Sequence, residues 1–412
     1  MNAASMPPDL AKPQPRLSMQ QVLVCGAMIV TLSMGIRHGF GLWMQPVITD
    51  RGWTRETFAF ALAVQNLAWG IAGPVAGGLA DRFGAYRVLI VGSLLYALGL
   101  VLMAVSSTGL AFMGSAGLIL GMAQSGTTYA VVYGVIGRQV APEKRSWAMG
   151  VAAAAGSFGQ FLMVPVENGL IGHVGWQNAL FILGCLALAI VPLAGGLKEP
   201  IAAAATGVRQ SMGAALREAF AYPSFRLLMA GYFVCGFQVV FIGVHMPSYL
   251  KDKGLGPEVA TGALMLIGLF NVFGTYIAGS LGQRMAKRHI LATIYALRGV
   301  AIFTFIHVPL TPLSVYIFAA TMGFLWLSTV PPTNAIVAQI FGVQYMSMLG
   351  GFVFLSHQIG SFLGVWLGGK LYDTTGSYDV VWWLCIALSA FAVLMNLPVR
   401  ESAIARPQAV PA

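Results

Sequence analysis

Apolar runs of about 20 residues recur along almost the whole chain, and this recurrence restricts the possible folds more than any other feature. A helix of that length crosses the ~30 Å hydrocarbon core of a bilayer. Inside lipid the backbone must satisfy its own hydrogen bonds, which a helix does within one segment. The composition agrees, because 58% of the 412 residues are apolar and 9% are charged, whereas soluble domains have about 45–50% and about 25%. We therefore predict an all-α membrane protein.

The apolar runs predict twelve spans in two groups of six. They cover residues 21–48, 56–80, 87–106, 109–137, 147–171 and 177–196, and then 227–250, 257–281, 290–308, 313–340, 348–371 and 379–397. The two six-helix bundles are thus expected at 21–196 and 227–397. The longest polar segment, 197–226, is expected to be a linker that includes an amphipathic surface helix. Residues 1–20 and 398–412 are expected to be tails, and the first apolar run is too long for the core of a signal peptide.

Lys and Arg residues gather in alternate loops, and this pattern predicts the orientation. One side carries Lys12, Arg16, Arg82, Arg87, Arg138, Lys144, Arg145, the basic residues of the linker, Arg284, Lys287, Arg288 and Arg400. Cytoplasmic loops carry the excess of Lys and Arg, so we expect both termini in the cytoplasm and the protein in a bacterial-type inner membrane. The net charge of +10 is then a topology signal, and no nucleic-acid partner is expected.

The sequence offers little support for an enzyme. The cysteines Cys25, Cys185, Cys235 and Cys385 lie inside apolar runs and form no CxxC pair, so we expect neither a metal site nor a disulfide framework. No nucleophile motif or phosphate-binding loop is present, and the loops are too short for a catalytic domain. We expect no cofactor. A membrane enzyme or a sensor that does not transport remains the alternative from another functional class.

An internal repeat relates the two halves. Residues 77–87 read GGLADRFGAYR, and residues 279–288 read GSLGQRMAKR, which is 279 − 77 = 202 positions later. The tripeptide Gly-Ser-Phe at 156–158 recurs at 360–362, an offset of 204. Repeated halves around a central site are the architecture of many secondary transporters.

The motif G-x-L-A-D-R-x-G followed by Arg resembles the loop motif of the major facilitator superfamily, and its degenerate copy lies where that family has one. The resemblance covers about residues 20 to 397. It implies twelve helices in two pseudo-symmetric six-helix halves, and transport by alternating access. It also implies a cytoplasmic gate formed by Gly77, Asp81, Arg82, Gly84 and Arg87. The alternative for these charges is that they anchor the loop in water.

Within the superfamily, residues 35–43 (GIRHGFGLW), 52–56 (GWTRE) and 236–250 resemble bacterial members of the monocarboxylate porter group. The animal monocarboxylate carriers have a lysine in the first span, near Leu42 here, and an Asp…Arg pair in the eighth. This chain has Asn271 and no arginine in its eighth span. The substrate-binding chemistry of those carriers therefore does not transfer directly.

Ionisable residues inside the spans are candidates for function, because each costs at least ~2.5–3.5 kcal/mol at the bilayer centre. Glu167 is the one acid well inside a span, whereas the bases are Arg37, His38, His245, Arg298 and His357. A buried cation needs a counter-ion, so this bias favours an anionic substrate. Arg37, 37 − 21 = 16 residues into its span, can hold a carboxylate with two hydrogen bonds. The alternatives for Arg37 are a structural pair with Glu167 or a carbonyl, or snorkelling to the interface.

The other substrate-binding candidates each have a structural alternative, in which the side chain packs or bonds within the protein. They are His38, Tyr129, Tyr133, Gln238, Asn271, Arg298 and His357. Glu167 and His245 are the candidates for carrying a coupled proton, because a buried acid or a histidine can change its charge during transport.

These observations predict a secondary transporter, acting as a monomer in membrane lipid, that carries a small organic anion. A monocarboxylate is the favoured anion, with proton symport or anion exchange as the coupling. The alternative transporter is a proton-coupled exporter of drugs or other small molecules. Such exporters usually have an Arg three residues before a Gln in the fourth span, where this chain has Gly121 before Gln124, and a Gly-Pro motif in the fifth span that 147–171 lacks.

Overall fold

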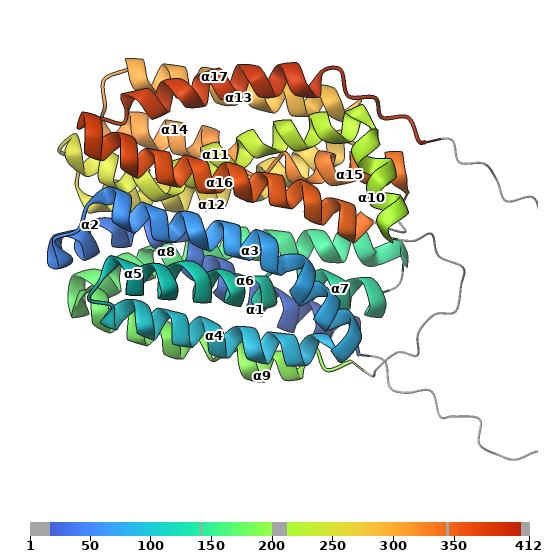
Figure 1. Ribbon diagram of the computed structural model, residues 1–412, viewed down its shortest axis with the longest axis horizontal. Coiled ribbons are helices and arrows are strands. Elements are labelled where there is room, and N and C mark those ends of the chain that lie inside the picture. Colours follow the sequence, from blue (N-terminus) through green and yellow to red (C-terminus); the bar gives the residue numbers. More distant parts are fainter. Residues whose placement is uncertain (1–16, 141, 200–211, 343–345, 405–412) are drawn as a thin grey trace, which may run out of the picture.

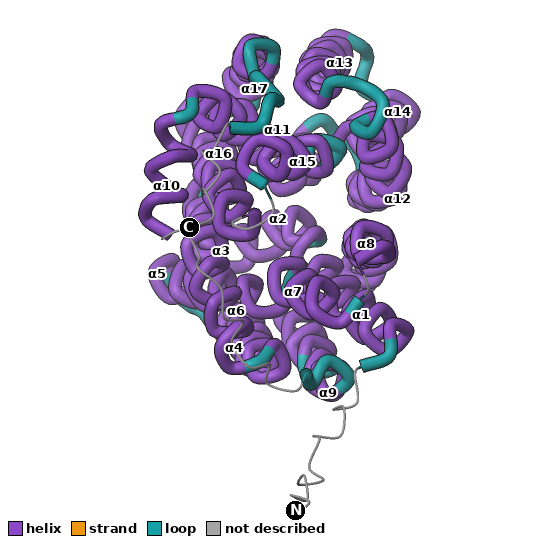
Figure 2. The backbone as a smooth tube through the Cα atoms, turned by 90° about the vertical axis from the view of Figure 1, so that its right-hand side faces the viewer, coloured by secondary structure: helices purple, strands orange, loops and turns teal. Residues whose placement is uncertain are grey.

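The computed structural model of the protein describes residues 17–140, 142–199, 212–342 and 346–404, and the secondary structure in these ranges is helical. The helices run roughly parallel to one long axis (Figure 1). The N-terminal half, blue to green, lies beside the C-terminal half, yellow to red. Seen along the helices, the two halves form two adjoining groups (Figure 2).

In its described residues, 17–140 and 142–199, the N-terminal half has ten helical segments. They are α1 (Met19–His38), α2 (Phe40–Arg51), α3 (Arg55–Phe83), α4 (Ala85–Val105), α5 (Gly109–Phe112), the π-helical η1 (Met113–Ile119), α6 (Leu120–Thr127), α7 (Tyr129–Gln139), α8 (Pro142–Ala187) and α9 (Ile190–Gly195).

The C-terminal half begins with a short helix in the expected linker. Its segments are α10 (Met212–Ala221), α11 (Pro223–Asp252), α12 (Pro257–Leu281), α13 (Lys287–His307), α14 (Pro312–Leu325), α15 (Val330–Phe341), α16 (Met346–Thr375) and α17 (Asp379–Asn396). α11 begins at Pro223, before the expected residue 227, because proline is favoured in the first turn of a helix. Of the linker, residues 200–211 lie outside the described ranges.

The twelve expected spans are present, although ten helical stretches in the described residues are long and apolar enough to be counted as spans. One stretch, Ala148–Gly195, contains both the fifth and the sixth expected spans. Gly175 separates these two, with φ of 79° and ψ of 160°, a backbone conformation that glycine adopts without steric cost. The fourth span is divided among α5, η1, α6 and α7 and is not among the ten stretches.

Besides the fourth span, two further spans of the described part of the chain are interrupted well inside the protein. The first span breaks at Gly39, between α1 and α2, and the tenth breaks between Leu325 at the end of α14 and Val330 at the start of α15. A helix end leaves main-chain groups without partners in the helix. Interrupted helices at membrane depth are tolerated where protein surrounds them, and both breaks lie near the candidate site described below.

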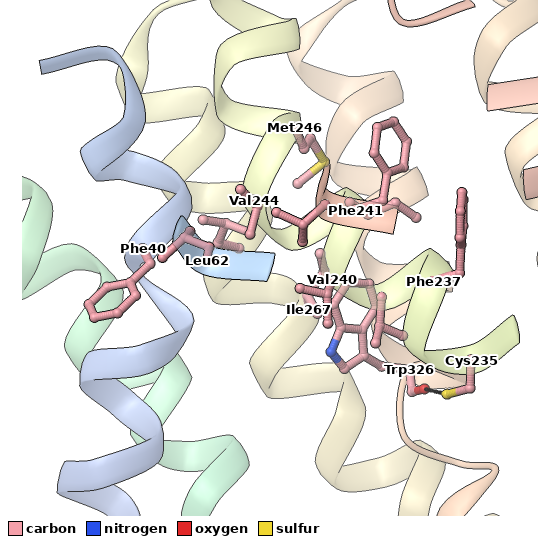
Figure 3. Packing of buried hydrophobic residues seen from close by; sticks show 14 of the residues in the cluster. Phe40, Leu62, Cys235, Phe237, Val240, Phe241, Val244, Met246, Ile267 and Trp326 are labelled. Carbon is pink, nitrogen blue, oxygen red and sulfur yellow. Dashed lines mark hydrogen bonds between the residues drawn. The ribbon is translucent and has the colours of Figure 1, made fainter. Parts of the chain in front are cut away.

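The two halves share one apolar core. The largest cluster of buried side chains includes Phe40 and Leu62 from the N-terminal half and Val240, Val244 and Trp326 from the C-terminal half. Figure 3 draws side chains of this cluster from both halves, among them Phe40 and Leu62 of the N-terminal half and Val244 of α11. Many large apolar side chains on the outside are exposed, as expected for surfaces that face lipid tails. The halves therefore pack on each other through their inner faces.

Candidate binding site between the two halves

The end of the molecule that carries α10 is called here the linker end, and the opposite end, with α2, the far end (Figure 1). At the far end Arg55, the first residue of α3, contacts Asp252, the last residue of α11, through Nη1–Oδ2 and Nη2–Oδ1 distances of 2.7 and 2.6 Å. Arg55 also donates to the Tyr378 hydroxyl at 2.9 Å, and its guanidinium lies 3.8 Å from the ring centroid of Tyr372. One cation thus connects the N-terminal half to three residues of the C-terminal half.

His245, a predicted proton carrier, belongs to the same far-end network. Its Nε2 is 2.8 Å from the carbonyl oxygen of Val365, and its Nδ1 is 3.1 Å from the Tyr378 hydroxyl. Because the carbonyl only accepts, Nε2 is the donor and Nδ1 accepts from Tyr378. Burial raises the pKa of Tyr378, which keeps its hydroxyl able to donate. Both ring nitrogens of His245 therefore have partners in this conformation.

A second set of contacts at the far end involves Glu56 and α16. The backbone N–H of Glu56 donates to Asp373 Oδ2 at 2.7 Å, and Trp366 Nε1 donates to Glu56 Oε1 at 3.1 Å. A Cβ placed on Gly369 would lie 2.9 Å from the carbonyl oxygen of Arg55, so the two helices touch backbone to backbone. The far end is closed by close packing as well as by charge.

Toward the linker end the packing between the halves is looser. Along α3, a Cβ on Gly70 would lie 2.9 Å from Gln358 of α16, whereas a Cβ on Gly73, Gly77 or Gly78 would meet nothing within 4 Å. Gly150, near the start of α8, is equally open. The two halves are therefore in close contact from the far end to about Gly70 and less so beyond it.

Only some residues of the predicted gate motif are described in full. Gly84, with φ of 91°, lies between α3 and α4, and Arg87 on α4 is exposed. The side chains of Asp81 and Arg82 lie outside the described part of the structure. The role of these five residues as a gate therefore stays a prediction; of the described ones, Gly77 has open space where a Cβ would be.

Arg37, in the last turn of α1, is partly exposed. Its Nη2 donates to Asn66 Oδ1 of α3, and its guanidinium carbon lies 4.9 Å from the ring centroid of Trp69. Its Nε is buried without a hydrogen-bond partner. Among the described residues no carboxylate lies within ion-pair distance of Arg37. The guanidinium thus has a neutral amide and an aromatic ring as neighbours, and it retains a free donor.

Aromatic rings connect this position to the C-terminal half. Trp69 meets Phe354 of α16 edge to face at 5.2 Å between ring centroids. Phe354 stacks on His357 at 5.8 Å, and His357 lies 5.0 Å from Tyr232 of α11. The Nε2 atom of His357 is buried without a partner. The structure therefore brings two predicted binding residues, Arg37 and His357, to opposite sides of one aromatic contact, and each has an unpaired nitrogen.

Arg298 is fully buried and bonds to the break in the tenth span. Its Nε and Nη2 donate to the Leu325 carbonyl at 3.2 and 2.7 Å, and Nη2 also donates to the Trp326 carbonyl. Its Nη1 reaches Gln238 Oε1 at 3.4 Å. Gln238 Nε2 in turn donates to the Cys385 carbonyl at 2.9 Å. In this conformation both predicted binding residues, Arg298 and Gln238, use their polar atoms to hold helices of the C-terminal half together.

Asn271 is buried where α12 contacts the N-terminal half. Its Nδ2 donates to Ser157 of α8 at 3.0 Å, and its Oδ1 accepts from the backbone N–H of Leu327 at 3.0 Å. It also accepts from Thr275 at 3.1 Å. Asn271 thus joins the two halves beside the same break in the tenth span, so a role in contacting substrate would require these bonds to open.

The remaining binding candidates lie along the first and fourth spans. The rings of Tyr129 and Tyr133 are tilted by 36° with 5.5 Å between their centroids, and Tyr129 packs against Gly156 of α8. The Nδ1 of His38 is 2.6 Å from the Met34 carbonyl one turn earlier. These contacts place all three side chains in the N-terminal half beside α1, but they do not bring them into contact with Arg37.

Several site residues were missed in the sequence. Arg55 and Glu56 enter the sequence analysis only as part of the segment 52–56, and no sequence pattern singles out Trp69, Phe354 or Tyr232. The partners of Arg55, Asp252 and Tyr378, lie 197 and 323 positions away in the sequence, so no local pattern reveals these contacts. The helix N-cap Thr54, whose side chain accepts from Thr57 N at 3.2 Å, is the one local signal that fixes where α3 and hence Arg55 begin.

The chain is similar to known membrane transporters over most of its length. The sequence model of the Major Facilitator Superfamily matches residues 23–365. The uncharacterized MFS-type transporter YcxA of Bacillus subtilis is 22% identical over 382 residues, which cover 88% of this chain and 90% of that protein. Monocarboxylate transporter 13 of Bos taurus is 25% identical over 382 residues, covering 89% and 86%. Monocarboxylate transporter 11 of Mus musculus is 25% identical over 387 residues, covering 89% and 84%.

A solved structure has the same fold. The bacterial homolog of the human lysosomal transporter Spinster, solved in an inward-facing and unoccupied conformation, matches with a TM-score of 0.71 at 14% identity. The match covers 93% of this chain and 96% of that one. It confirms the predicted architecture of two helical halves.

Proposed function

Because the chain belongs to the major facilitator superfamily and is therefore a multi-pass membrane transporter, we propose that it carries a small organic anion through a site centred on Arg37. A monocarboxylate is the favoured substrate. The two halves would rock about this site, so that it opens to each side in turn. The protein would act as a monomer in a bacterial-type inner membrane. Both termini would lie in the cytoplasm, because the Lys and Arg residues of the loops gather on their side.

The unpaired state of Arg37 carries this proposal. A partly buried cation loses part of its hydration, and a counter-charge or hydrogen bonds compensate that loss. Here the described residues give Arg37 an amide and an aromatic face, and leave its Nε donor unused. A carboxylate that accepts from Nε and one Nη would supply both the charge and the missing bond. A cationic substrate would meet repulsion at the same place.

The named relatives support a monocarboxylate as the first acid to test, since two of them are monocarboxylate transporters that align over most of this chain. The aromatic contact between Trp69 and Phe354 supplies an apolar surface next to Arg37. A small acid with one carboxylate and an apolar body fits these two features. His357, with its unpaired Nε2, is the polar contact proposed from the C-terminal half.

Alternating access is supported by the difference between the two ends. The far end is held by Arg55, Asp252 and Glu56, whereas glycines of α3 near the linker end face open space. If the linker end is cytoplasmic, this is an inward-facing conformation. In the opposite state the far-end contacts would open, and the motif residues Gly77, Asp81, Arg82, Gly84 and Arg87 would close the linker end.

The test is uptake of radiolabelled lactate, pyruvate and related short acids into proteoliposomes, with and without an imposed pH gradient. We expect saturable uptake that is lost in Arg37→Ala and reduced in Arg37→Lys, because lysine keeps the charge but lacks the planar fork. Faster uptake under the pH gradient indicates proton symport. Faster uptake into vesicles that have been loaded with an unlabelled carboxylic acid indicates anion exchange. The matched control is Arg284→Ala, which removes an exposed arginine near the linker end.

Absence of transport of every acid by a folded preparation would contradict the anion proposal. In that case the drug-exporter alternative becomes the first to examine, with export of a fluorescent hydrophobic cation as the assay. Equal uptake of an acid by the wild type and Arg37→Ala would instead support an anionic substrate but show that Arg37 is not its binding site.

A further inference from the structure

Glu167 is buried in the N-terminal half in an arrangement that the binding site does not use. Its side chain is fully buried on α8. Its Oε2 accepts one hydrogen bond from Trp43 Nε1 of α2 at 2.7 Å, and its Oε1 has no partner. Among the described residues, no Lys, Arg or His lies within ion-pair distance. A carboxyl group with a single neutral donor is poorly compensated as an anion.

The carboxyl group lies in a notch in the first span. A Cβ placed on Gly39 would overlap Oε2 of Glu167, so only glycine leaves room for it. Gly39 is the residue at which the first span breaks between α1 and α2. Arg37 lies two residues before the notch and Trp43 four residues after it. The contacts of Glu167 therefore hold the short segment of chain that carries the proposed substrate-binding arginine.

We propose that Glu167 is the proton-binding site of this transporter, and that its proton sets the position of Arg37 through the segment from Gly39 to Trp43. The part of this inference that concerns substrate coupling rests on the proposed function. The proton-binding part does not, because it follows from burial and contacts at Glu167 alone. The two parts can therefore fail separately.

The surroundings of Glu167 leave few other groups to take the proton. Four elements besides α2 pack on α8. Among the described side chains, α1 has Arg37 and His38, α4 has Tyr86, Arg87 and Tyr96, α7 has Tyr129 and Tyr133, and α12 has Glu258 and Tyr276 toward its two ends; α2 itself has Asp50 and Arg51 in its last turn. Tyr96 lies close enough to interact electrostatically with both Glu167 and Arg37, but its hydroxyl donates to the Ser33 carbonyl at 2.9 Å. His245, the other predicted proton carrier, has partners for both ring nitrogens.

Charge balance explains how one proton would be coupled to one anion. With the proton on Glu167 and an anion on Arg37, the pair of sites has no net charge. With both ligands released, the carboxylate and the guanidinium again cancel. A single ligand leaves one net charge in the low-dielectric interior, which is unfavourable. The two neutral forms are therefore the ones that cross between conformations. In the structure Arg37 bonds to Asn66 and Glu167 to Trp43, so the two groups do not pair with each other.

The test compares the wild type with Glu167→Gln, which keeps the shape and the contact with Trp43. In infrared spectra of the purified protein, recorded without substrate across a pH series, we expect a protonated-carboxyl carbonyl band in the wild type that is absent from Glu167→Gln. In proteoliposomes with radiolabelled pyruvate as the probe, we expect the variant to lose accumulation driven by a pH gradient but to keep counterflow exchange. The control is Glu258→Gln, which removes an exposed acid.

The possible results separate cleanly. Gradient-driven accumulation by Glu167→Gln, or a carboxyl band that the substitution leaves unchanged, would overturn the proposal. If Glu167→Gln loses both counterflow and gradient-driven accumulation, Glu167 has a structural role, and this result would also overturn the proposal. A band that disappears while neither protein transports pyruvate would support the proton site and count against the proposed substrate.

Discussion

The guanidinium of Arg55 and the carboxylate of Asp252 form a two-point ion pair between the halves, with Nη1–Oδ2 and Nη2–Oδ1 distances of 2.7 and 2.6 Å. The arginine side chain is 9% exposed and the aspartate 28%. Such a paired, partly buried geometry is stronger than an ordinary surface ion pair. It connects the start of α3 to the end of α11, so it exists only while the far end is closed.

Asp252→Asn is expected to open the far end more often. The variant keeps one acceptor but loses the charge, and a hydrogen bond to a charged group contributes about 1.5–3 kcal/mol, or roughly a ten- to hundredfold change in the ratio of the two conformations. Distances between spin labels at the exposed positions Asp50 and Lys253 would show a longer component. Lys370→Gln is the control, because exposed Lys370 lies 4.0 Å from Glu56 and such pairs contribute little. An unchanged distance distribution in Asp252→Asn would argue against this pair as a lock.

Asn66→Asp is expected to abolish binding of an anion. Asn66 Oδ1 already accepts from Arg37, so an aspartate there would supply an internal carboxylate in the place proposed for the substrate. The matched variant Asn66→Ala removes the amide without adding charge and should weaken binding less. Uptake of the labelled acids measures both. Improved transport of a hydrophobic cation by Asn66→Asp would favour the exporter alternative.

Arg298→Met is expected to destabilise the C-terminal half more than it weakens substrate binding. The guanidinium bonds to the carbonyls of Leu325 and Trp326 at the break in the tenth span, and a buried group left without its partner costs about 1–3 kcal/mol. Thermal unfolding in detergent should shift to lower temperature, with Arg284→Met, an exposed arginine, as the control. An unchanged unfolding temperature combined with a raised KM would instead make Arg298 a substrate ligand.

The spans could be predicted from the sequence because each depends on the summed hydropathy of about 20 residues. The breaks could not, since Gly39 and Leu325 both fall inside apolar runs that are long enough to be single spans, 21–48 and 313–340. Intramembrane charge identified Arg37, Glu167 and Arg298 as candidates, but it does not distinguish a free guanidinium from one that bonds to two carbonyls. That difference depends on which helices pack together. The Arg55–Asp252 pair, 197 positions apart, depends on the same packing.

Gly41→Ala and Gly77→Ala are expected to shift the two conformations in opposite directions. A Cβ on Gly41 would overlap the carbonyl oxygen of Gly243, so the first variant strains the contact between the halves that closes the far end. Overpacking of this kind typically costs about 1–3 kcal/mol. A Cβ on Gly77 meets nothing within 4 Å, so the second variant is accommodated here and would obstruct closure of the linker end.

Labelling of single introduced cysteines by a membrane-impermeant thiol reagent shows which end of the molecule is open in each of these two variants. A cysteine at Asp50 reports on the far end and one at Arg284 on the linker end, since both positions are exposed. Gly41→Ala should raise labelling at position 50, and Gly77→Ala should raise it at position 284. A shift in the same direction for both would mean that the halves do not rock about a central site, because rocking requires one end to close as the other opens.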